Sequence, residues 1–254
     1  MCRHLAYLGS PMPLAELLLT PEYGLLTQAW APRRQRNGTV NADGFGVGWY
    51  APGDPLPARY RRAIPIWADR SFADVARVTS SGAVLAAVRS ATPGMTQEES
   101  AAAPYAHGPW LFSHNGRVEG WPGALEDLAA SLPPARLLAL EAQVDSALLW
   151  ALVLERLAAG DSAGDALTHV VSNVAAVTGG RLNFLLTDGT GIAATAAGDT
   201  LFWRAGPGSV VVASEPYDDG PGWHEVPDNC LLTATASHVD IRPIPNLTKE
   251  QVAP

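Results

Sequence analysis

The second residue of the chain is a cysteine, and a cysteine in this position can act as a nucleophile with its own base. Removal of Met1, which is common when the second residue is small, would leave Cys2 with a thiol and a free α-amine. An α-amine has an ordinary pKa of about 7.7–8.0 and a thiol one of about 8.5, so near neutral pH the amine can accept the thiol proton. Position alone, however, favours a simpler interpretation, a small second residue on a first strand.

Arg89 begins an Arg-Ser-Ala-Thr motif that ends at Thr92 and follows a buried apolar run. A guanidinium at the end of a buried strand is costly to desolvate unless an anion meets it, and its fork suits a carboxylate. An internal salt bridge to an Asp or Glu of the chain explains the arginine equally well. The motif therefore leaves a ligand carboxylate site and a structural ion pair as alternatives.

Asn115 and Gly116 belong to a His-Asn-Gly motif after another short apolar run. The asparagine amide and a glycine N–H are suitable donors for a developing oxyanion, because glycine lets the backbone come close. Asn-Gly is also a common hairpin turn, and the tripeptide alone favours the turn.

Two acidic motifs complete the set of candidates. Asp145-Ser146 precedes a helical pattern, where Asp145 can hold an ammonium group, although capping of the helix explains it equally well. Ser214-Glu215 follows a strand pattern and can close one side of a pocket, although a turn is the favoured interpretation.

The elements that must position these residues follow the order strands, helices, strands. Strands are expected at 2–8, 43–50, 83–89, 110–113, 181–187, 191–196, 201–204, 209–213, 230–234 and 238–242, and helices at 13–19, 71–78 and within 121–180. The glycines alternating with apolar residues in 43–50 indicate a strand that another group approaches closely. This segregation predicts an α+β protein with packed antiparallel sheets covered by helices, in a single domain spanning 2–254.

Composition limits the classes of partner. The chain has 254 residues, 47% of them hydrophobic, and a formal net charge of −8, which argues against nucleic-acid binding and against an anionic membrane surface. Cys2 and Cys230 are too few for a disulfide framework, and no cysteine or histidine spacing predicts a metal site. No signal peptide or membrane span is visible, so we expect a soluble, cytoplasmic protein with a small-molecule partner.

In the order Cys2, Arg-Ser-Ala-Thr, His-Asn-Gly, Asp-Ser, the motifs resemble the glutaminase domain of the class II glutamine amidotransferases. These enzymes are N-terminal nucleophile (Ntn) hydrolases, and the resemblance runs from Cys2 to Arg242. It implies the Ntn hydrolase fold, a four-layer αββα sandwich of two packed antiparallel sheets flanked by helices. We expect no cofactor.

The resemblance also implies roles for the reacting groups. Cys2 would be the nucleophile and its α-amine the base. The Asn115 side chain and the Gly116 N–H would form the oxyanion hole. His4 and His114 are then expected to be structural, because the α-amine already supplies the base.

The resemblance further implies how a γ-glutamyl group is held. Arg89, with Thr92 close by, would bind its α-carboxylate, and Asp145 would bind its α-ammonium. The chain departs from the family pattern at two places. Asn-Ala-Asp-Gly at 41–44 stands where many relatives carry Arg-Gly-x-Asp-Gly, and Pro93 follows Thr92 where some relatives have histidine.

The opening MCRHLAYLG and the segment NADGFGVGWY resemble the γ-glutamyl hydrolases of ergothioneine biosynthesis, which release glutamate from γ-glutamyl-hercynylcysteine sulfoxide. The alternatives are a glutaminase subunit that delivers ammonia to a separate synthase, a general γ-glutamyl amidase and a catalytically silent binding module. Full amidotransferases carry a second domain to receive ammonia, and we expect none in this chain.

The pocket for the leaving half of such a substrate is not readable from the sequence. Four tryptophans are candidates for a cation–π contact with a trimethylammonium group, although tryptophans are more often core residues. They are Trp30, Trp49, Trp110 and Trp203. Cys230 is expected to be a small buried hydrophobic residue.

Overall fold

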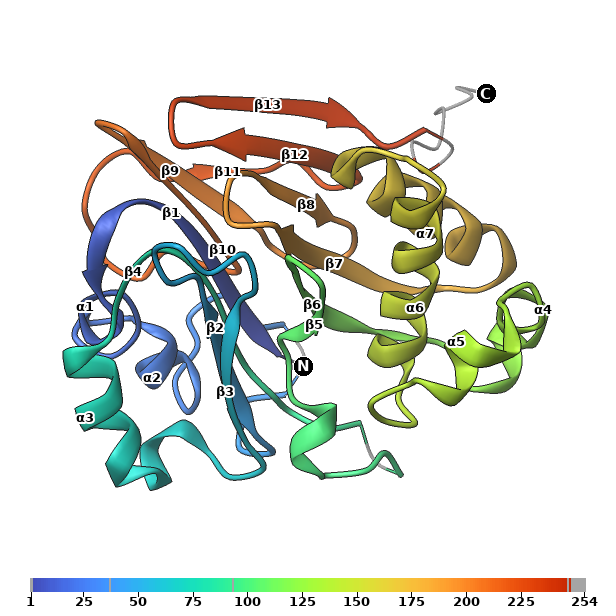
Figure 1. Cartoon of the computed structure of the whole chain (residues 1–254), viewed down its shortest axis with the longest axis horizontal. Coiled ribbons are helices and arrows are strands. Elements are labelled where there is room, and N and C mark those ends of the chain that lie inside the picture. The colour runs from blue at the N-terminus through green and yellow to red at the C-terminus, as the bar shows by residue number, and fades with distance from the viewer. Residues whose placement is uncertain (1, 37, 93, 246, 248–254) are drawn as a thin grey trace.

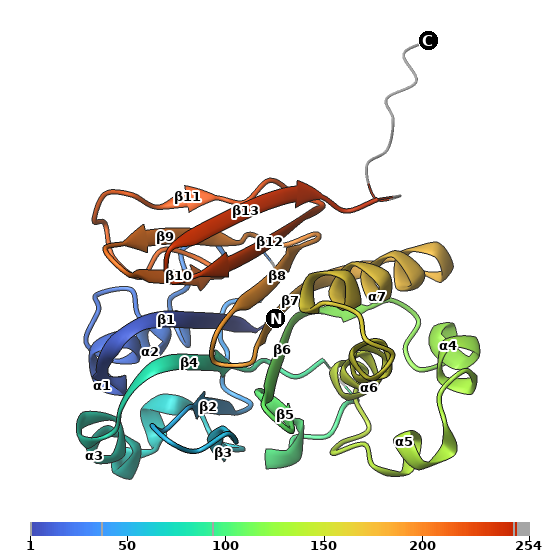
Figure 2. The ribbon, with the colours of Figure 1, turned by 45° about the horizontal axis from the view of Figure 1, so that its top comes forward.

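Two antiparallel sheets pack face to face, and helices cover the outer face of each (Figures 1 and 2). The computed structural model describes residues 2–36, 38–92, 94–245 and 247. Separate apolar clusters lie between the sheets and under each helical layer. The predicted four-layer αββα sandwich is therefore confirmed. The sequence indicates no regular element for 243–254, and most of these residues lie outside the described part of the chain.

The first sheet has the strand order β11-β9-β10-β1-β4-β2-β3. Its strands are β1 (Arg3–Pro13), β2 (Phe45–Trp49), β3 (Ala58–Arg62), β4 (Ser80–Val88), β9 (Phe202–Gly206), β10 (Ser209–Ala213) and β11 (His224–Glu225). Helices α1 (Leu14–Leu18), α2 (Leu25–Gln28) and α3 (Arg70–Val78) pack on its outer face. Alternation along β1 explains the layering, because Leu5 and Tyr7 face these helices while Ala6 and Leu8 face the second sheet.

The second sheet has the strand order β13-β12-β8-β7-β6-β5. Its strands are β5 (Tyr105–His107), β6 (Trp110–Val118), β7 (Gly180–Thr187), β8 (Ile192–Ala196), β12 (Cys230–Thr235) and β13 (His238–Pro243). The segment between β6 and β7 forms α4 (Glu126–Ala130), α5 (Pro134–Leu138), α6 (Asp145–Ala158) and α7 (Ala163–Val177). Among the described residues, no helix is both long enough and apolar enough to cross a membrane.

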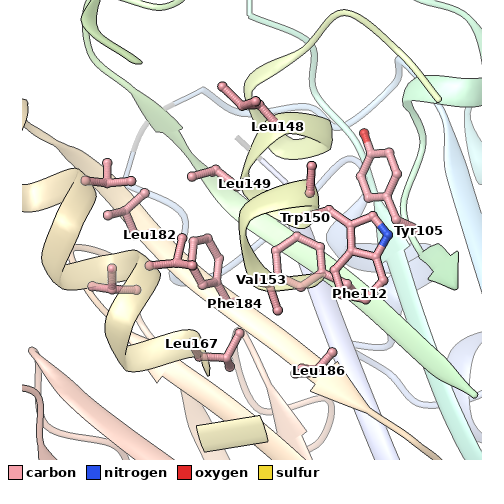
Figure 3. Packing of buried hydrophobic residues seen from close by; sticks show 14 of the residues in the cluster. Tyr105, Phe112, Leu148, Leu149, Trp150, Val153, Leu167, Leu182, Phe184 and Leu186 are labelled. Atoms are coloured by element: carbon pink, nitrogen blue, oxygen red, sulfur yellow. The ribbon is translucent and has the colours of Figure 1, made fainter. Parts of the chain in front are cut away.

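Aromatic packing holds α6 and α7 against the second sheet (Figure 3). Phe112 of β6 stacks on Trp150 of α6 with ring centroids 5.1 Å apart and planes at 10°, and Phe184 of β7 packs beside it. The apolar residues of α7 are buried as far as Val174, whereas Val177 is 52% exposed because the helix ends there. This packing fixes where α6 begins, and therefore where Asp145 lies.

Strand β6 is longer than predicted. It runs through the His-Asn-Gly motif to Val118, and Asn115 and Gly116 pair with Asn183 and Leu182 of β7. The hairpin turn that the tripeptide favoured is therefore wrong, because the partner strand continues alongside both residues. The short edge strands β3, β5 and β11 were not predicted, and β3 in particular carries mostly polar, partly exposed residues.

The glycines of β2 lie where other chain segments come close, as the sequence indicates. A Cβ at Gly48 would lie 2.6 Å from the Leu111 side chain, and one at Gly46 would collide with the carbonyl oxygen of Ala103. Glycine therefore lets β2 of the first sheet approach β6 of the second sheet and the segment that precedes β5.

Candidate active site

The start of β1 is tied to its neighbours on both sides. His4 N–H donates to Ser214 Oγ at 3.0 Å, and Ser214 N–H donates to the His4 carbonyl at 2.9 Å. The His4 ring Nδ1 lies 3.2 Å from Ser113 Oγ on β6, so the same residue also joins the two sheets. Figure 2 shows this blue end of β1 beside β6. Cys2, which is half-buried, is held at a defined position between the sheets.

Arg89 and Cys2 adjoin the ends of two paired strands. The ladder between the antiparallel strands β1 and β4 ends with Arg3 opposite Val88, so Cys2 and Arg89 are the next residue on each side. Arg89 is 7% exposed and donates to two carbonyls, that of Thr96 at 2.8 Å and that of Asp43 at 3.4 Å. Within the described residues it makes no ion pair. The structural salt bridge considered from the sequence is therefore wrong.

The segment 41–44 supports the Arg-Ser-Ala-Thr motif. Asp43 Oδ2 accepts from the Ala91 N–H at 2.8 Å, and the Asp43 N–H donates to the Arg89 carbonyl at 2.9 Å. Arg89 N–H in turn donates to Gly44, whose φ of +131° favours glycine. The departure from the family pattern here thus retains an aspartate-glycine pair that holds Arg89 in place.

Asn115 and Gly116 are brought to the same end of β1. The Asn115 side chain is fully buried, and its Nδ2 donates to Ser214 Oγ at 3.4 Å. A Cβ at Gly116 would collide with the carbonyl oxygen of Arg181 and lie 2.5 Å from His114 Nε2. Both ring nitrogens of His114 are engaged, Nδ1 with Ser146 Oγ and Nε2 with the Arg181 carbonyl, each at 2.9 Å. This bonding agrees with the structural role expected for His114.

Asp145 is the first residue of α6 and not its cap. The N-cap is Val144, which makes no side-chain cap hydrogen bond, so the predicted Asp-Ser cap is wrong. Asp145 Oδ1 accepts from the Ser146 N–H at 2.7 Å, and Oδ2 reaches back to accept from the Val118 N–H at 3.0 Å. The residue is 4% exposed and, in the described part of the chain, forms no ion pair. The N-terminus of α6 stabilises this buried negative charge.

The buried Tyr105 shows that these charges share one region. Burial raises the pKa of Tyr105, the positive charge of Arg89 lowers it, and the charges of Asp145, Glu141 and Cys2 raise it. Arg89, Asp145 and Cys2 therefore all lie within electrostatic range of a single phenol.

A cavity of about 300 Å³ opens beside these residues. It is lined by Thr92, Gly94, Met95, Arg117, Val118, Trp121, Pro122 and Gln143. Of these lining residues, Thr92 is the last residue of the Arg-Ser-Ala-Thr motif, and Val118 donates its N–H to the Asp145 carboxylate. Trp121 was not predicted, while none of the four tryptophans singled out from the sequence lines this cavity. Trp30 packs edge-on against Trp67, and Trp203 stacks on His224.

Glu215 is a further residue whose importance the sequence did not reveal. It is fully buried, and its two carboxylate oxygens accept from the backbone N–H groups of Arg33 and Arg34 at 2.9 and 2.8 Å. Gln35 Oε1 accepts from Arg3 Nε at 3.1 Å. The loop 33–36 is therefore fastened to the start of β1. Ser214-Glu215 was expected to be a turn, and no sequence pattern indicates a buried carboxylate there.

Over the described residues, no group of three or more histidine, cysteine, aspartate or glutamate side chains is placed to hold a metal ion. Cys230 is buried among apolar residues between the sheets, as expected. Both cysteines are free thiols.

A family model described as glutamine amidotransferases class-II matches residues 25–219. The chain belongs to this family of enzymes. It is 44% identical over 245 residues to a γ-glutamyl-hercynylcysteine sulfoxide hydrolase of Mycolicibacterium smegmatis, and the match covers 96% of this chain and 100% of the relative. A protein of the same name from Mycobacterium tuberculosis is 43% identical, with 95% of this chain and 96% of the relative covered.

Solved structures of this family share the fold. A glutamine aminotransferase class-II domain protein from Silicibacter pomeroyi matches with a TM-score of 0.69 at 24% identity, over 96% of this chain and 99% of that one. The glutamine phosphoribosylpyrophosphate amidotransferase of Bacillus subtilis matches with a TM-score of 0.68 at 15% identity, over 96% of this chain and 50% of that one. The Ntn hydrolase fold expected from the sequence is thus confirmed.

Glu215→Gln is expected to loosen the loop 33–36. The amide keeps one acceptor, but its NH₂ group faces a backbone N–H. Loss of a charge-assisted hydrogen bond worth about 1.5–3 kcal/mol should make local opening of the loop 33–36 at least about tenfold more frequent. Limited trypsin digestion measures this directly, because the loop carries Arg33, Arg34 and Arg36. Asp219→Ala removes only the exposed ion pair with Arg33 and is the matched control. Equal cleavage rates in the two variants would contradict the anchoring role of Glu215.

Proposed function

We propose that the chain hydrolyses a γ-glutamyl amide bond, with Cys2 as nucleophile, and releases glutamate from γ-glutamyl-hercynylcysteine sulfoxide. One observation carries this proposal. Arg89 and Asp145 are both buried near Cys2, and neither makes an ion pair within the described residues. Uncompensated buried charges cost several kcal/mol each, so their retention points to a ligand that carries both opposite charges.

The head of a γ-glutamyl group has these two charges on one carbon. Its α-carboxylate fits the guanidinium of Arg89, and its α-ammonium fits the carboxylate of Asp145. Thr92, three residues after Arg89, lies on the wall of the adjoining cavity. Recognition of the head then places the γ-carbonyl toward Cys2, while the leaving half extends beyond it.

The reaction follows as two acyl transfers. The α-amine of Cys2 takes the thiol proton, and the thiolate attacks the γ-carbonyl carbon. Asn115 Nδ2 and the Gly116 N–H stabilise the oxyanion. The ammonium then gives its proton to the leaving nitrogen, the C–N bond breaks, and a thioester remains. Water, deprotonated by the same amine, attacks the thioester to release glutamate and restore the thiol.

This mechanism requires a free α-amine on Cys2. Met1 lies outside the described residues, so its removal is part of the proposal. A catalytically silent module would have no need for Cys2, Asn115, Gly116, Arg89 and Asp145 together. The choice of γ-glutamyl-hercynylcysteine sulfoxide is supported by the names of the relatives at 43% and 44% identity. The cytoplasmic location, the single domain and the lack of nucleic-acid or membrane partners remain predictions from the sequence.

Cys2→Ala is expected to abolish turnover while the substrate still binds. Removal of the nucleophile should lower kcat by at least about 10³-fold. Cys230→Ala is the control, because it removes the other thiol, which is buried in the inter-sheet core. Release of glutamate is measured from γ-glutamyl-hercynylcysteine sulfoxide and from glutamine. Turnover by Cys2→Ala would exclude the nucleophile, and equal kcat/KM for the two substrates in the unaltered enzyme would favour the ammonia-delivering alternative.

Asp145→Asn is expected to change which head group is accepted. The unaltered enzyme should reject a glutaryl amide, which lacks the α-amino group, because Asp145 would then be buried without a cation. In Asp145→Asn, kcat/KM for the γ-glutamyl substrate should fall by about 10²-fold or more, and the preference over the glutaryl amide should shrink by a similar factor. An unchanged preference would show that Asp145 does not face the ammonium. Asp165→Asn, which alters an exposed ion pair, is the control.

A further inference from the structure

Buried polar atoms without a hydrogen-bond partner gather around the start of β1. Among the described residues, all but Thr168 Oγ1 belong to side chains of this region: Arg3 Nη1 and Nη2, His4 Nε2, Asn41 Oδ1, Asn115 Oδ1, Arg181 Nε, and Asp199 Oδ1 and Oδ2. Buried polar groups in folded proteins are nearly always bonded, so such a concentration marks a functional site. Asn115 is already assigned to the oxyanion hole, but Arg3 and Asp199 have no role in the reaction described so far.

Arg3 directly follows the nucleophile and is fully buried. Its Nε donates to Gln35 Oε1, which leaves both terminal nitrogens without a partner. Burial lowers the pKa of Arg3, and the negative charges of Glu215, Asp199 and Cys2 raise it. Arg3 therefore lies within electrostatic range of both Cys2 and Asp199.

Asp199 is held at this place by its backbone. Asn183, which lies opposite Asn115 in the ladder, donates from Nδ2 to the Asp199 carbonyl at 2.8 Å and accepts the Asp199 N–H on Oδ1 at 3.1 Å. The adjacent Thr200 donates from Oγ1 to the Ser214 carbonyl at 2.8 Å. Asp199 thus lies beside the segment that pairs with the start of β1.

The Asp199 carboxylate itself makes no hydrogen bond. Its side chain is fully buried, and Arg181 Nε approaches Oδ2 at 3.3 Å without hydrogen-bonding geometry. Burial raises the pKa of Asp199, while the positive charges of Arg3, Arg181 and Arg36 lower it. An ion pair that only stabilised the fold would bond its oxygens to its cations, as the partly exposed pair of Arg204 and Asp218 does in this protein at 2.7 and 2.9 Å.

We propose that Asp199 and Arg3 are positioning residues for the α-amine of Cys2, with the Asp199 carboxylate accepting hydrogen bonds from the amine and the Arg3 guanidinium offsetting its negative charge. This inference rests on the proposed function, since it requires Cys2 to be the N-terminal base. A primary amine suits the site because it donates in both protonation states. The carboxylate turns the amine toward the thiol, and the guanidinium keeps the amine able to release its proton near neutral pH.

The two residues act in opposite directions on the titration of Cys2. The reactive state holds one proton shared between thiol and amine, so activity falls when a second proton is added and when the shared proton is lost. A negative charge beside this pair of groups favours both protonation steps, and a positive charge opposes them, so Asp199 and Arg3 act in opposite directions. The other charged groups that act on this pair are Arg181, Arg36 and Glu215, which remain in place in the variants below.

The test is the pH profile of kcat/KM for a γ-glutamyl substrate. Asp199→Asn should move both limbs by about one pH unit toward lower pH, and Arg3→Gln should move them by a similar amount toward higher pH. Each variant should also lower kcat by about 10–100-fold, with a smaller change in KM, because the amine is less well oriented. Asp161→Asn, which alters an aspartate paired with Arg156 far along the chain, should leave the profile unchanged.

The double variant Arg3→Gln, Asp199→Asn covers the case in which a single variant does not fold. It removes both buried charges together, so it should fold. The two limbs of its pH profile should lie close to those of the unaltered enzyme, while its kcat should still be lower. Thermal unfolding of every variant separates loss of structure from loss of rate. A folded Asp199→Asn with unshifted limbs, or a double variant with full kcat, would overturn the proposal.

Failure of this positioning role can be distinguished from failure of the proposed function. If Cys2→Ala is inactive while Asp199→Asn retains the normal profile, the positioning role is wrong and the nucleophile stands. If Cys2→Ala is active, the proposed function fails first.

Discussion

The reciprocal hydrogen bonds between His4 and Ser214 are the constraint on which the site depends. They extend the pairing of β1 with β10 to His4, two residues after Cys2, while β4 pairs with β1 on the other side as far as Arg3. A residue beside a chain terminus would ordinarily be mobile. Cys2 instead directly precedes an interior strand of a sheet, whose backbone hydrogen bonds restrict its freedom.

Several charged side chains are buried around that fixed point. Arg89, Asp145 and Asp199 are buried with few or no bonds to an opposite charge, whereas ordinary pairs such as Arg204–Asp218 are bidentate. Backbone groups compensate part of the cost, since carbonyls meet Arg89 and N–H groups meet Asp145. The proposed function accounts for the remaining cost at Arg89 and Asp145, because a zwitterionic head would bring an opposite charge to each of them.

Much of this was readable from the sequence, because alternating apolar residues mark most strands and Arg89 stands at the end of one. Three features were not. Asn115-Gly116 has the local signature of a turn, and only the partner strand β7 keeps it extended. Asp145 lies one residue after the N-cap position of α6, and the packing of the helix determines where that position falls. Glu215 and Asp199 are ordinary acidic residues until the fold buries them. Each depends on a contact between distant parts of the chain.

The central claim is that a free N-terminal Cys2 carries the glutamyl group during turnover. The most direct measurement is acid quenching of the enzyme during reaction with a γ-glutamyl substrate, followed by mass spectrometry of its N-terminal peptide. The account predicts a peptide that begins at Cys2 and carries one glutamyl group as a thioester. An active enzyme whose N-terminal peptide retains Met1, or whose glutamyl group is attached to another residue, would contradict it.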